Sequence, residues 1–286
     1  MDRAVEVNRV AIIGAGTIGS AVAMALRPHF QVMVTRRRGG IPTELLEAGV
    51  EEGGANQEAA SWADVVILAV KPYQVLEVMS QISEVAPEAA PKVVVSLAAA
   101  MTIQMMEAVC PFPVVRAMTN TACRIRRGYT VYSNGLAVGE EEEAVVRSVF
   151  RSMGAFEKVD EQYLDVLTAM SGSGPAYMYT VLEAMILGAL KAGLPRDLAL
   201  RAAANTAIGA SSLLLESGGH PAELRDQVIT PGGVTIEGLY ELEEGRVRTA
   251  FMRAVSAAAL RSVELADSAR RSAMDKGILA MQVKER

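Results

Sequence analysis

The first part of the chain alternates short apolar runs with segments of helical periodicity. The β-branched runs show no apolar–polar alternation and cover residues 10–13, 31–34, 65–70, 92–96 and 114–118. Strands of this kind are buried on both faces, as in a parallel sheet that helices cover on each side. The pattern therefore predicts a doubly wound α/β domain over residues 1–160.

Beyond residue 160 the β-branched runs stop and helical spacing continues almost without a break. Prolines at several starts and glycines after several ends predict helices over residues 161–170, 175–192, 195–216, 220–228, 234–244 and 248–271. These Ala-, Gly- and Ser-rich segments are apolar over much of the helix circumference, and no predicted sheet covers them. We therefore expect residues 161–286 to form an all-α domain that packs against a second copy of the chain.

Composition narrows the class of protein. Hydrophobic residues make up 51% of the chain, but no uninterrupted apolar run approaches a membrane span of ~18 residues. The net charge of -5 argues against a nucleic-acid partner. The cysteines, Cys110 and Cys123, form neither a CxxC pair nor a disulfide framework, and the first residues lack the apolar stretch of a signal peptide. A cytoplasmic protein is expected, and no metal site is predicted.

A glycine motif lies between the first apolar run and the following helical segment. Gly14, Gly16 and Gly19 form GxGxxG in "VAIIGAGTIGSAVAMAL". In this context Gly14 permits the tight turn, Gly16 lets the backbone approach a pyrophosphate, and Gly19 allows close helix packing. The motif therefore predicts a Rossmann-type dinucleotide site at the helix N-terminus, and a purely structural glycine turn is the alternative.

The second predicted strand ends at the position where the ribose specificity of a dinucleotide is set. Thr35 replaces the acidic residue that would bind the 2′-OH of NAD, and Arg36, Arg37 and Arg38 follow. Guanidinium groups pair with a 2′-phosphate, so NADP is the favoured cofactor; a solvated arginine loop is the alternative. Asn56 is either a helix N-cap or a cofactor contact.

Lys71 and Pro72 close the third predicted strand at its carboxyl end, the edge where open α/β sheets bind ligands. Lys71 is therefore a candidate for contact with the cofactor or for a catalytic role. A lysine in this place is also commonly just solvated.

Two glycine-containing stretches lie in the helical half. Thr230, Gly232, Gly233 and Thr235 in "ITPGGVT" offer backbone N–H groups and hydroxyls near a helix start, which would suit a carboxylate; an ordinary turn is the alternative. In "SGSGPAY" (residues 171–177), glycines at the start of a long helix would leave space for a ring close to the backbone.

Several stretches resemble the pyrroline-5-carboxylate reductase family. They are "GAGTIGSAVAMAL", "AVKP", "VVRAMTNT", "LTAMSGSGPAYMYTVLEAM", "AGLPRDLAL" and "LLLESGGHPAELRDQVITPGGVTIEGLYELEEG". The resemblance runs from about residue 10 to 264 and implies the last step of proline biosynthesis, reduction of 1-pyrroline-5-carboxylate to L-proline with NAD(P)H. It also implies a homodimer through the helical domain, with further assembly into decamers in some members. Each active site would then lie between one subunit's cofactor domain and its partner's helices.

The same resemblance assigns roles to individual positions. Those that would hold the dinucleotide are Gly14, Ala15, Gly16, Thr17, Ile18, Gly19, Ala69, Val70, Lys71 and Pro72, with Thr35, Arg36 and Asn56 near the adenosine ribose and Ala98 and Ala99 near the nicotinamide. Those that would line the pyrroline site are Glu161, Gln227, Val234 and Thr235, with Thr235 as the residue that hydrogen-bonds substrate. The chain departs from the family pattern where prolines or a glycine are common, at Thr119, Ala122 and Ala100, and where a serine is common, at Thr230.

Three alternative functions remain open from the sequence. A reductase of another cyclic imino acid would use the same site, and a protein that senses NADP(H) without chemistry would need only the first domain. A β-hydroxyacid dehydrogenase would need a catalytic lysine, but Lys191 lies at the far end of its helix from the SGSGP turn.

Overall fold

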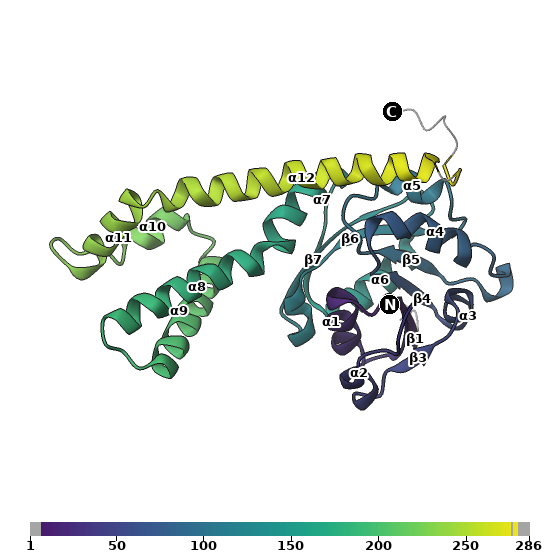
Figure 1. Cartoon of the computed structure of the whole chain (residues 1–286), viewed down its shortest axis with the longest axis horizontal. Helices are drawn as coiled ribbons and strands as arrows, with labels where there is room; N and C mark the ends of the chain where they lie inside the picture. The colour runs from purple at the N-terminus through teal and green to yellow at the C-terminus, as the bar shows by residue number, and fades with distance from the viewer. Residues whose placement is uncertain (1–6, 276, 280–286) are drawn as a thin grey trace. The chain divides into compact units, whose positions relative to one another are not determined.

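The computed structural model describes residues 7–275 and 277–279 (Figure 1). Packing divides the chain into two compact units, one made of Met1–Ser173 with Ser256–Arg286 and the other of Gly174–Val255. The predicted boundary at residue 160 follows the change from strands to helices, whereas this division follows packing. Helix α12 (Val247–Asp275) consequently has residues in both units.

The first unit is built on one sheet. Its strands in the described part of the chain are β1 (Arg9–Ile13), β2 (Gln31–Thr35), β3 (Glu51–Gly53), β4 (Val65–Leu68), β5 (Val93–Ser96), β6 (Val114–Met118), β7 (Gly128–Asn134) and β8 (Gly154–Lys158). The strand order is β3-β2-β1-β4-β5-β6-β7-β8, and neighbours pair in parallel except for the antiparallel pair β6–β7. The predicted doubly wound α/β fold is confirmed, but the sheet is mainly rather than wholly parallel, because β7 and β8 run against the other strands.

Helices cover both faces of this sheet (Figure 1). Alternate strand residues such as Val10 and Ile12 pack in one apolar cluster with α1 (Thr17–Leu26), α2 (Thr43–Glu47) and α6 (Glu140–Arg151). The residues between them, such as Ala11 and Ile13, pack in a second cluster with α3 (Asn56–Trp62), α4 (Pro72–Ile82), α5 (Ile103–Glu107) and the end of α12. Strands buried on both faces explain the continuous apolar runs. Short 3₁₀ segments lie at η1 (Pro87–Ala89) and η2 (Thr121–Ile125).

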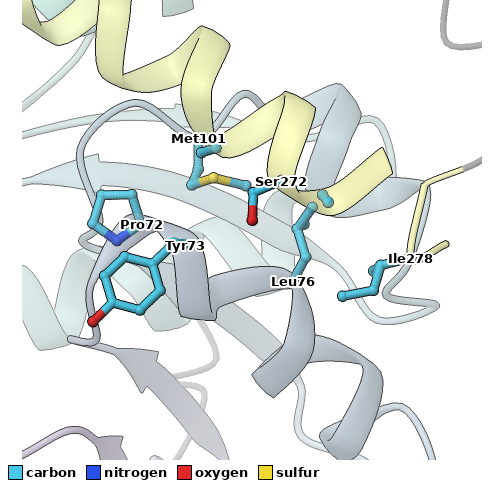
Figure 2. Close-up of a pocket in the computed structure, with 8 residues that line it drawn as sticks. Pro72, Tyr73, Leu76, Met101, Ser272 and Ile278 are labelled. Atoms are coloured by element: carbon cyan, nitrogen blue, oxygen red, sulfur yellow. The ribbon is translucent and has the colours of Figure 1, made fainter. Parts of the chain in front are cut away.

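The end of α12 packs over α4 and the loop after β5. Ala269 and Ala273 belong to the second apolar cluster. Figure 2 shows Ser272 beside Met101 and above Leu76, with Pro72 on the other side of Met101. The space between these side chains is about 10 Å³, the size at which one water molecule barely fits. It is a packing gap rather than a ligand site.

The passage from the sheet to the second unit is irregular. The regular helix predicted over residues 161–170 is wrong: the chain forms a 3₁₀ turn η3 (Glu161–Tyr163), the short helix α7 (Leu164–Leu167) and a π-helical turn η4 (Thr168–Gly172). In η4 the Ser173 N–H donates to the Thr168 carbonyl, five residues back, at 3.0 Å.

The second unit is entirely helical in its described residues and has a small core. It contains α8 (Gly174–Lys191), α9 (Arg196–Ser217), α10 (Pro221–Asp226), α11 (Val234–Glu244) and the start of α12, close to the predicted bounds. Helices α8 and α9 pack side by side (Figure 1). Among its described apolar side chains only Ala199 and Ala203 are buried, whereas many large ones are exposed. In the part of the chain that the structure describes, α9 alone is long and apolar enough to cross a membrane, by length and composition.

Candidate functional site

A cleft lies over the carboxyl ends of β1, β2, β4 and β5. Two adjoining hollows of about 420 and 540 Å³ form it and share Gly14, Arg36, Arg37, Val70 and Gln74. Of the residues predicted to bind a dinucleotide, those that line the cleft are Gly14, Gly16, Thr17, Ile18, Thr35, Arg36, Arg37, Asn56, Ala69, Val70, Lys71, Pro72, Ala98 and Ala99. Ala15 and Gly19 are buried and do not line it.

The three motif glycines have distinct geometric reasons to be glycine. Gly14 has φ +114°, and a Cβ there would lie 2.8 Å from the Ala69 carbonyl oxygen. A Cβ at Gly19 would overlap the carbonyl oxygen of Gly14, so helix α1 packs directly on the turn. A Cβ at Gly16, in contrast, would meet no described atom within 4 Å. Gly14 and Gly19 thus build the turn, while Gly16 leaves its outer side open for a ligand.

The N-terminus of α1 is suited to an anion. Its N-cap is Gly16, no described side chain caps it, and its first turn carries no acidic residue. The first N–H groups of a helix have no partner within the helix, and the helix dipole adds partial positive charge. A pyrophosphate beside Gly16 would therefore find donors that no side chain competes for. These residues fit a dinucleotide.

The end of β2 places two arginines at one side of the cleft. Arg36 and Arg37 are exposed, and Arg36 Nη1 donates to the Gly40 carbonyl at 2.9 Å. Thr35 is buried, and its hydroxyl donates to Asn56 Oδ1 at 2.9 Å. Asn56 Nδ2 in turn donates to Gln81 Oε1 at 2.7 Å. The N-cap of α3 is Ala55, so the alternative of Asn56 as a helix N-cap is wrong.

The opposite end of the cleft carries a strained backbone position. Ala98 and Ala99 line the cleft after β5, and Ala100 follows with φ +66° and 1% exposure. An alanine in the left-handed region costs about 1–2 kcal/mol. The departure at Ala100, where the family pattern has glycine, therefore carries a physical cost.

The "TPGGVT" stretch forms a tight turn at the start of α11. The Gly233 N–H donates to the Thr230 carbonyl at 3.0 Å, and Gly232 has φ +67°. Proline at the second position and a positive φ at the third are features of a type II turn. The expectation that Gly233 offers its N–H to a ligand is therefore wrong, because Thr230 already accepts it.

The open donors of this bend belong instead to α11. Its N-cap is Gly233, and no described side chain caps it. Val234 is 91% exposed and Thr235, one residue further, is half-buried. The N–H groups of the first turn can receive a carboxylate, and the Thr235 hydroxyl offers one more hydrogen-bonding group beside them. Gln227 lies on the same unit as the exposed C-cap residue of α10.

Glu161 lies in the first unit and takes part in a partly buried ionic cluster. Its Oε1 accepts from the Ile103 N–H at 2.7 Å and from Arg116 Nη1 at 3.2 Å. Arg116, on β6, is 4% exposed and also donates to Asp165 at 2.8 Å, while the Ser262 hydroxyl donates to Asp165 at 2.9 Å. Sequence reasoning missed this cluster, although an arginine inside the apolar run "VVRAM" was a signal that it needed partners.

The glycines of "SGSG" are in different environments. A Cβ at Gly172 would overlap Met118 Cε at the end of β6, so the close approach at Gly172 is to a methionine of the same unit and not to a ring. A Cβ at Gly174 would meet no described atom within 4 Å. Asn120, which sequence reasoning also missed, donates from Nδ2 to the Ser171 carbonyl at 3.1 Å.

Other candidate groups have structural roles. His220 caps α10, because its Nδ1 accepts the Ala222 N–H at 3.2 Å. His29 is exposed and lies 3.4 Å from Arg126. Cys110 and Cys123 are free and buried, and burial raises the pKa of the Cys123 thiol to about 11, which makes it inert. Among the described residues no cluster of His, Cys, Asp and Glu could hold a metal ion.

Comparisons with known proteins connect both units to one enzyme. Residues 161–265 match the family model described as pyrroline-5-carboxylate reductase dimerisation, and residues 9–100 match NADP oxidoreductase coenzyme F420-dependent. A pyrroline-5-carboxylate reductase of Glycine max is 36% identical over 91% of this chain and 97% of its own. Pyrroline-5-carboxylate reductase 2 of Bos taurus is 38% identical over 90% and 83%, respectively.

Solved structures agree with these relatives. The Plasmodium falciparum pyrroline carboxylate reductase with NADP bound has a TM-score of 0.81 at 26% identity, covering 91% of this chain and 98% of its own. The pyrroline-5-carboxylate reductase of Coxiella burnetii has a TM-score of 0.77 at 30% identity, covering 91% and 99%.

Proposed function

The chain belongs to the pyrroline-5-carboxylate reductase family, and we propose that it reduces 1-pyrroline-5-carboxylate to L-proline with NADPH preferred over NADH. It is an oxidoreductase that uses a nicotinamide cofactor. The observation that carries the proposal is that one chain holds both a glycine-turn cleft and an uncapped α11 bend, within a similarity that spans 91% of its length.

The cleft supplies the contacts that a dinucleotide needs. The N-terminus of α1 and the open side of Gly16 receive the pyrophosphate, while Arg36 and Arg37 pair with the 2′-phosphate of NADP. Ala98 and Ala99 border the nicotinamide end. When bound, the nicotinamide supplies the hydride that reduces the C=N bond.

The α11 bend supplies the contacts for a small cyclic acid. The N–H groups of the first turn of α11 hold the carboxylate, and Thr235 acts as the catalytic residue by hydrogen-bonding the ring nitrogen. The imine is basic enough to enter partly as iminium, so orientation provides most of the catalysis and a dedicated acid is not required. This agrees with His220, whose Nδ1 is used for helix capping.

The second unit requires a partner to cover its apolar surface. We propose a homodimer through helices α8 to α12, with each site completed by the partner's α11 bend, in the cytoplasm. The support is the exposure of large side chains such as Leu215 and Met252 on helices whose described core is only Ala199 and Ala203. The same partner accounts for the apolar surface of α9 without a membrane.

A steady-state assay with a panel of cyclic imines tests the function. NADPH consumption is followed with 1-pyrroline-5-carboxylate, with its 2-carboxylate isomer and with the six-membered homologue. We expect the highest kcat/KM with 1-pyrroline-5-carboxylate. Preference for another ring would make the chain a different cyclic imino acid reductase, and NADPH binding without turnover of any imine would make it a sensor.

A further inference from the structure

The π-helical turn η4 lies beside the end of β6, the strand that pairs with β5. Strands β5 and β6 pair in parallel with Ser96 opposite Arg116, so Met118 at the end of β6 lies at the same edge of the sheet as Ala98, two residues after β5. Neighbouring strands are about 4.8 Å apart. The Met118 side chain in turn occupies the space above Gly172. The Met118 side chain therefore links η4 to the edge of the sheet that carries the cleft.

The turn itself has a weak internal framework. A π-helix is rare, is used as a single turn, and is frequent at functional sites. The hydroxyls of Thr168 and Ser171 donate to the carbonyls of Leu164 and Leu167 at 2.7 and 2.9 Å, a bonding pattern that bends helices. Gly172 adds backbone freedom. A turn of this kind keeps one conformation only if its surroundings hold it.

Asn120, which follows the end of β6, holds η4 by a hydrogen bond. Its side chain is 9% exposed and is engaged at both ends: Nδ2 donates to the Ser171 carbonyl at 3.1 Å, and Oδ1 accepts the Ala122 N–H at 3.1 Å. The preceding residue is also fixed, because the buried Thr119 hydroxyl accepts from the Thr130 hydroxyl of β7 at 2.9 Å. The amide is thus anchored to the sheet and reaches out to the π-helical turn.

We propose that Asn120 is a positioning residue for the reduction: through the Ser171 carbonyl it fixes η4 as the wall next to the nicotinamide end. The inference rests on the proposed function. A ring that lies between this wall and the cofactor would lose alignment when the wall moves, whereas the cofactor's phosphates, held at α1 and Arg36, would not. The expected signature is a loss in kcat at unchanged NADPH affinity.

Two substitutions remove the Nδ2 donor of Asn120 in different ways. Asn120→Asp keeps an acceptor for the Ala122 N–H but sets a carboxylate against the Ser171 carbonyl. Asn120→Ser retains a good N-cap and is too short to reach that carbonyl. Ser133→Ala is the matched control, because it removes another buried bond from a side chain to a carbonyl, the 2.6 Å bond from Ser133 to Val159, elsewhere on the sheet.

Four quantities are measured on each full-length variant: kcat and KM for the imine, the NADPH Kd by fluorescence, the isotope effect with 4-deuterated NADPH, and hydrogen exchange of residues 168–173 without cofactor. For both Asn120 variants we expect kcat to fall by about tenfold to 100-fold, with a larger isotope effect, faster exchange and a Kd within about twofold of the parent. Ser133→Ala should keep the parental kcat.

Three results would overturn the inference. They are a kcat within about twofold of the parent in both Asn120 variants, an equal loss in Ser133→Ala, and a loss of NADPH affinity that accounts for the whole effect. If the parent itself turns over none of the imines, the proposed function fails and this inference fails with it. Turnover by the parent with unaffected Asn120 variants refutes the inference alone.

Discussion

Arg36→Ala tests the choice between the two nicotinamide cofactors. Arg36 is exposed at the cleft and commits Nη1 to the Gly40 carbonyl at 2.9 Å, which orients the guanidinium and leaves its other N–H groups for a phosphate. The change to alanine removes those donors and one positive charge. NADH lacks the 2′-phosphate, so only NADPH should lose a partner.

The expected change in the NADPH Kd follows from the loss of a hydrogen bond to a charged phosphate. A hydrogen bond to a charged group contributes about 1.5–3 kcal/mol, and each 1.4 kcal/mol is about tenfold in Kd. Because Arg36 is exposed and solvent screens its charge, we expect the lower end, about a tenfold increase in the NADPH Kd. The NADH Kd should change by less than about twofold, since no charged bond is lost.

The assay is fluorescence titration of both cofactors at low and high salt. The control is Arg151→Ala, which removes an exposed arginine from the last turn of α6, outside the cleft. The difference between Arg36→Ala and the parent should shrink as salt rises. Equal losses for NADPH and NADH, or the same loss in Arg151→Ala, would refute the 2′-phosphate argument.

Three further predictions concern the α11 bend, the backbone strain at Ala100 and stability in acid. Thr235→Ala should lower turnover of 1-pyrroline-5-carboxylate by about tenfold or more at an unchanged NADPH Kd, because one bond to a charged group is lost; unchanged kinetics would remove Thr235 from the site. In denaturant unfolding, Ala100→Gly should lower the free energy of unfolding by about 1–2 kcal/mol less than Ala98→Gly does, because both changes delete a buried methyl group but only Ala100 has a positive φ. Equal losses of unfolding free energy would contradict the backbone strain at Ala100. Burial opposes the charged form of Glu143, yet hydrogen bonds from Lys158, Tyr132 and Asn134 lower its pKa below the ordinary value of 4.5. Its stabilisation is thus present above pH 4.5 and lost as pH falls through the lowered pKa, so the Tm advantage over Glu143→Gln should vanish in acid; a pH-independent difference would count against it.

The cofactor half was predictable because its signals are local. Buried parallel strands leave continuous apolar runs, and a glycine turn between strand and helix permits few geometries, so Gly14 and Gly19 could be assigned roles that the structure repeats. Strand β7 escaped detection because its residues, "GYTVYSN", mix polar and apolar types, although most of them are buried.

The features that the sequence did not predict depend mostly on hydrogen-bond partners elsewhere in the chain. Whether Gly233 offers its N–H depends on a turn closed by Thr230, and the partners of Arg116 are 45 and 49 residues away. The π-helical turn had local signs in Thr168, Ser171 and Gly172, but helical periodicity alone does not distinguish it from an α-helix. Periodicity indicates which residues are apolar. The local backbone geometry depends in addition on hydrogen-bond partners that periodicity does not reveal.

The most direct test of the central claim is a crystal structure with NADP⁺ and L-proline bound. We expect the pyrophosphate at the N-terminus of α1, the proline carboxylate at the first turn of α11 from the partner subunit, and the ring between Thr235 and the nicotinamide. Proline bound elsewhere, with the Thr230–Thr235 bend empty and remote from the nicotinamide, would contradict it.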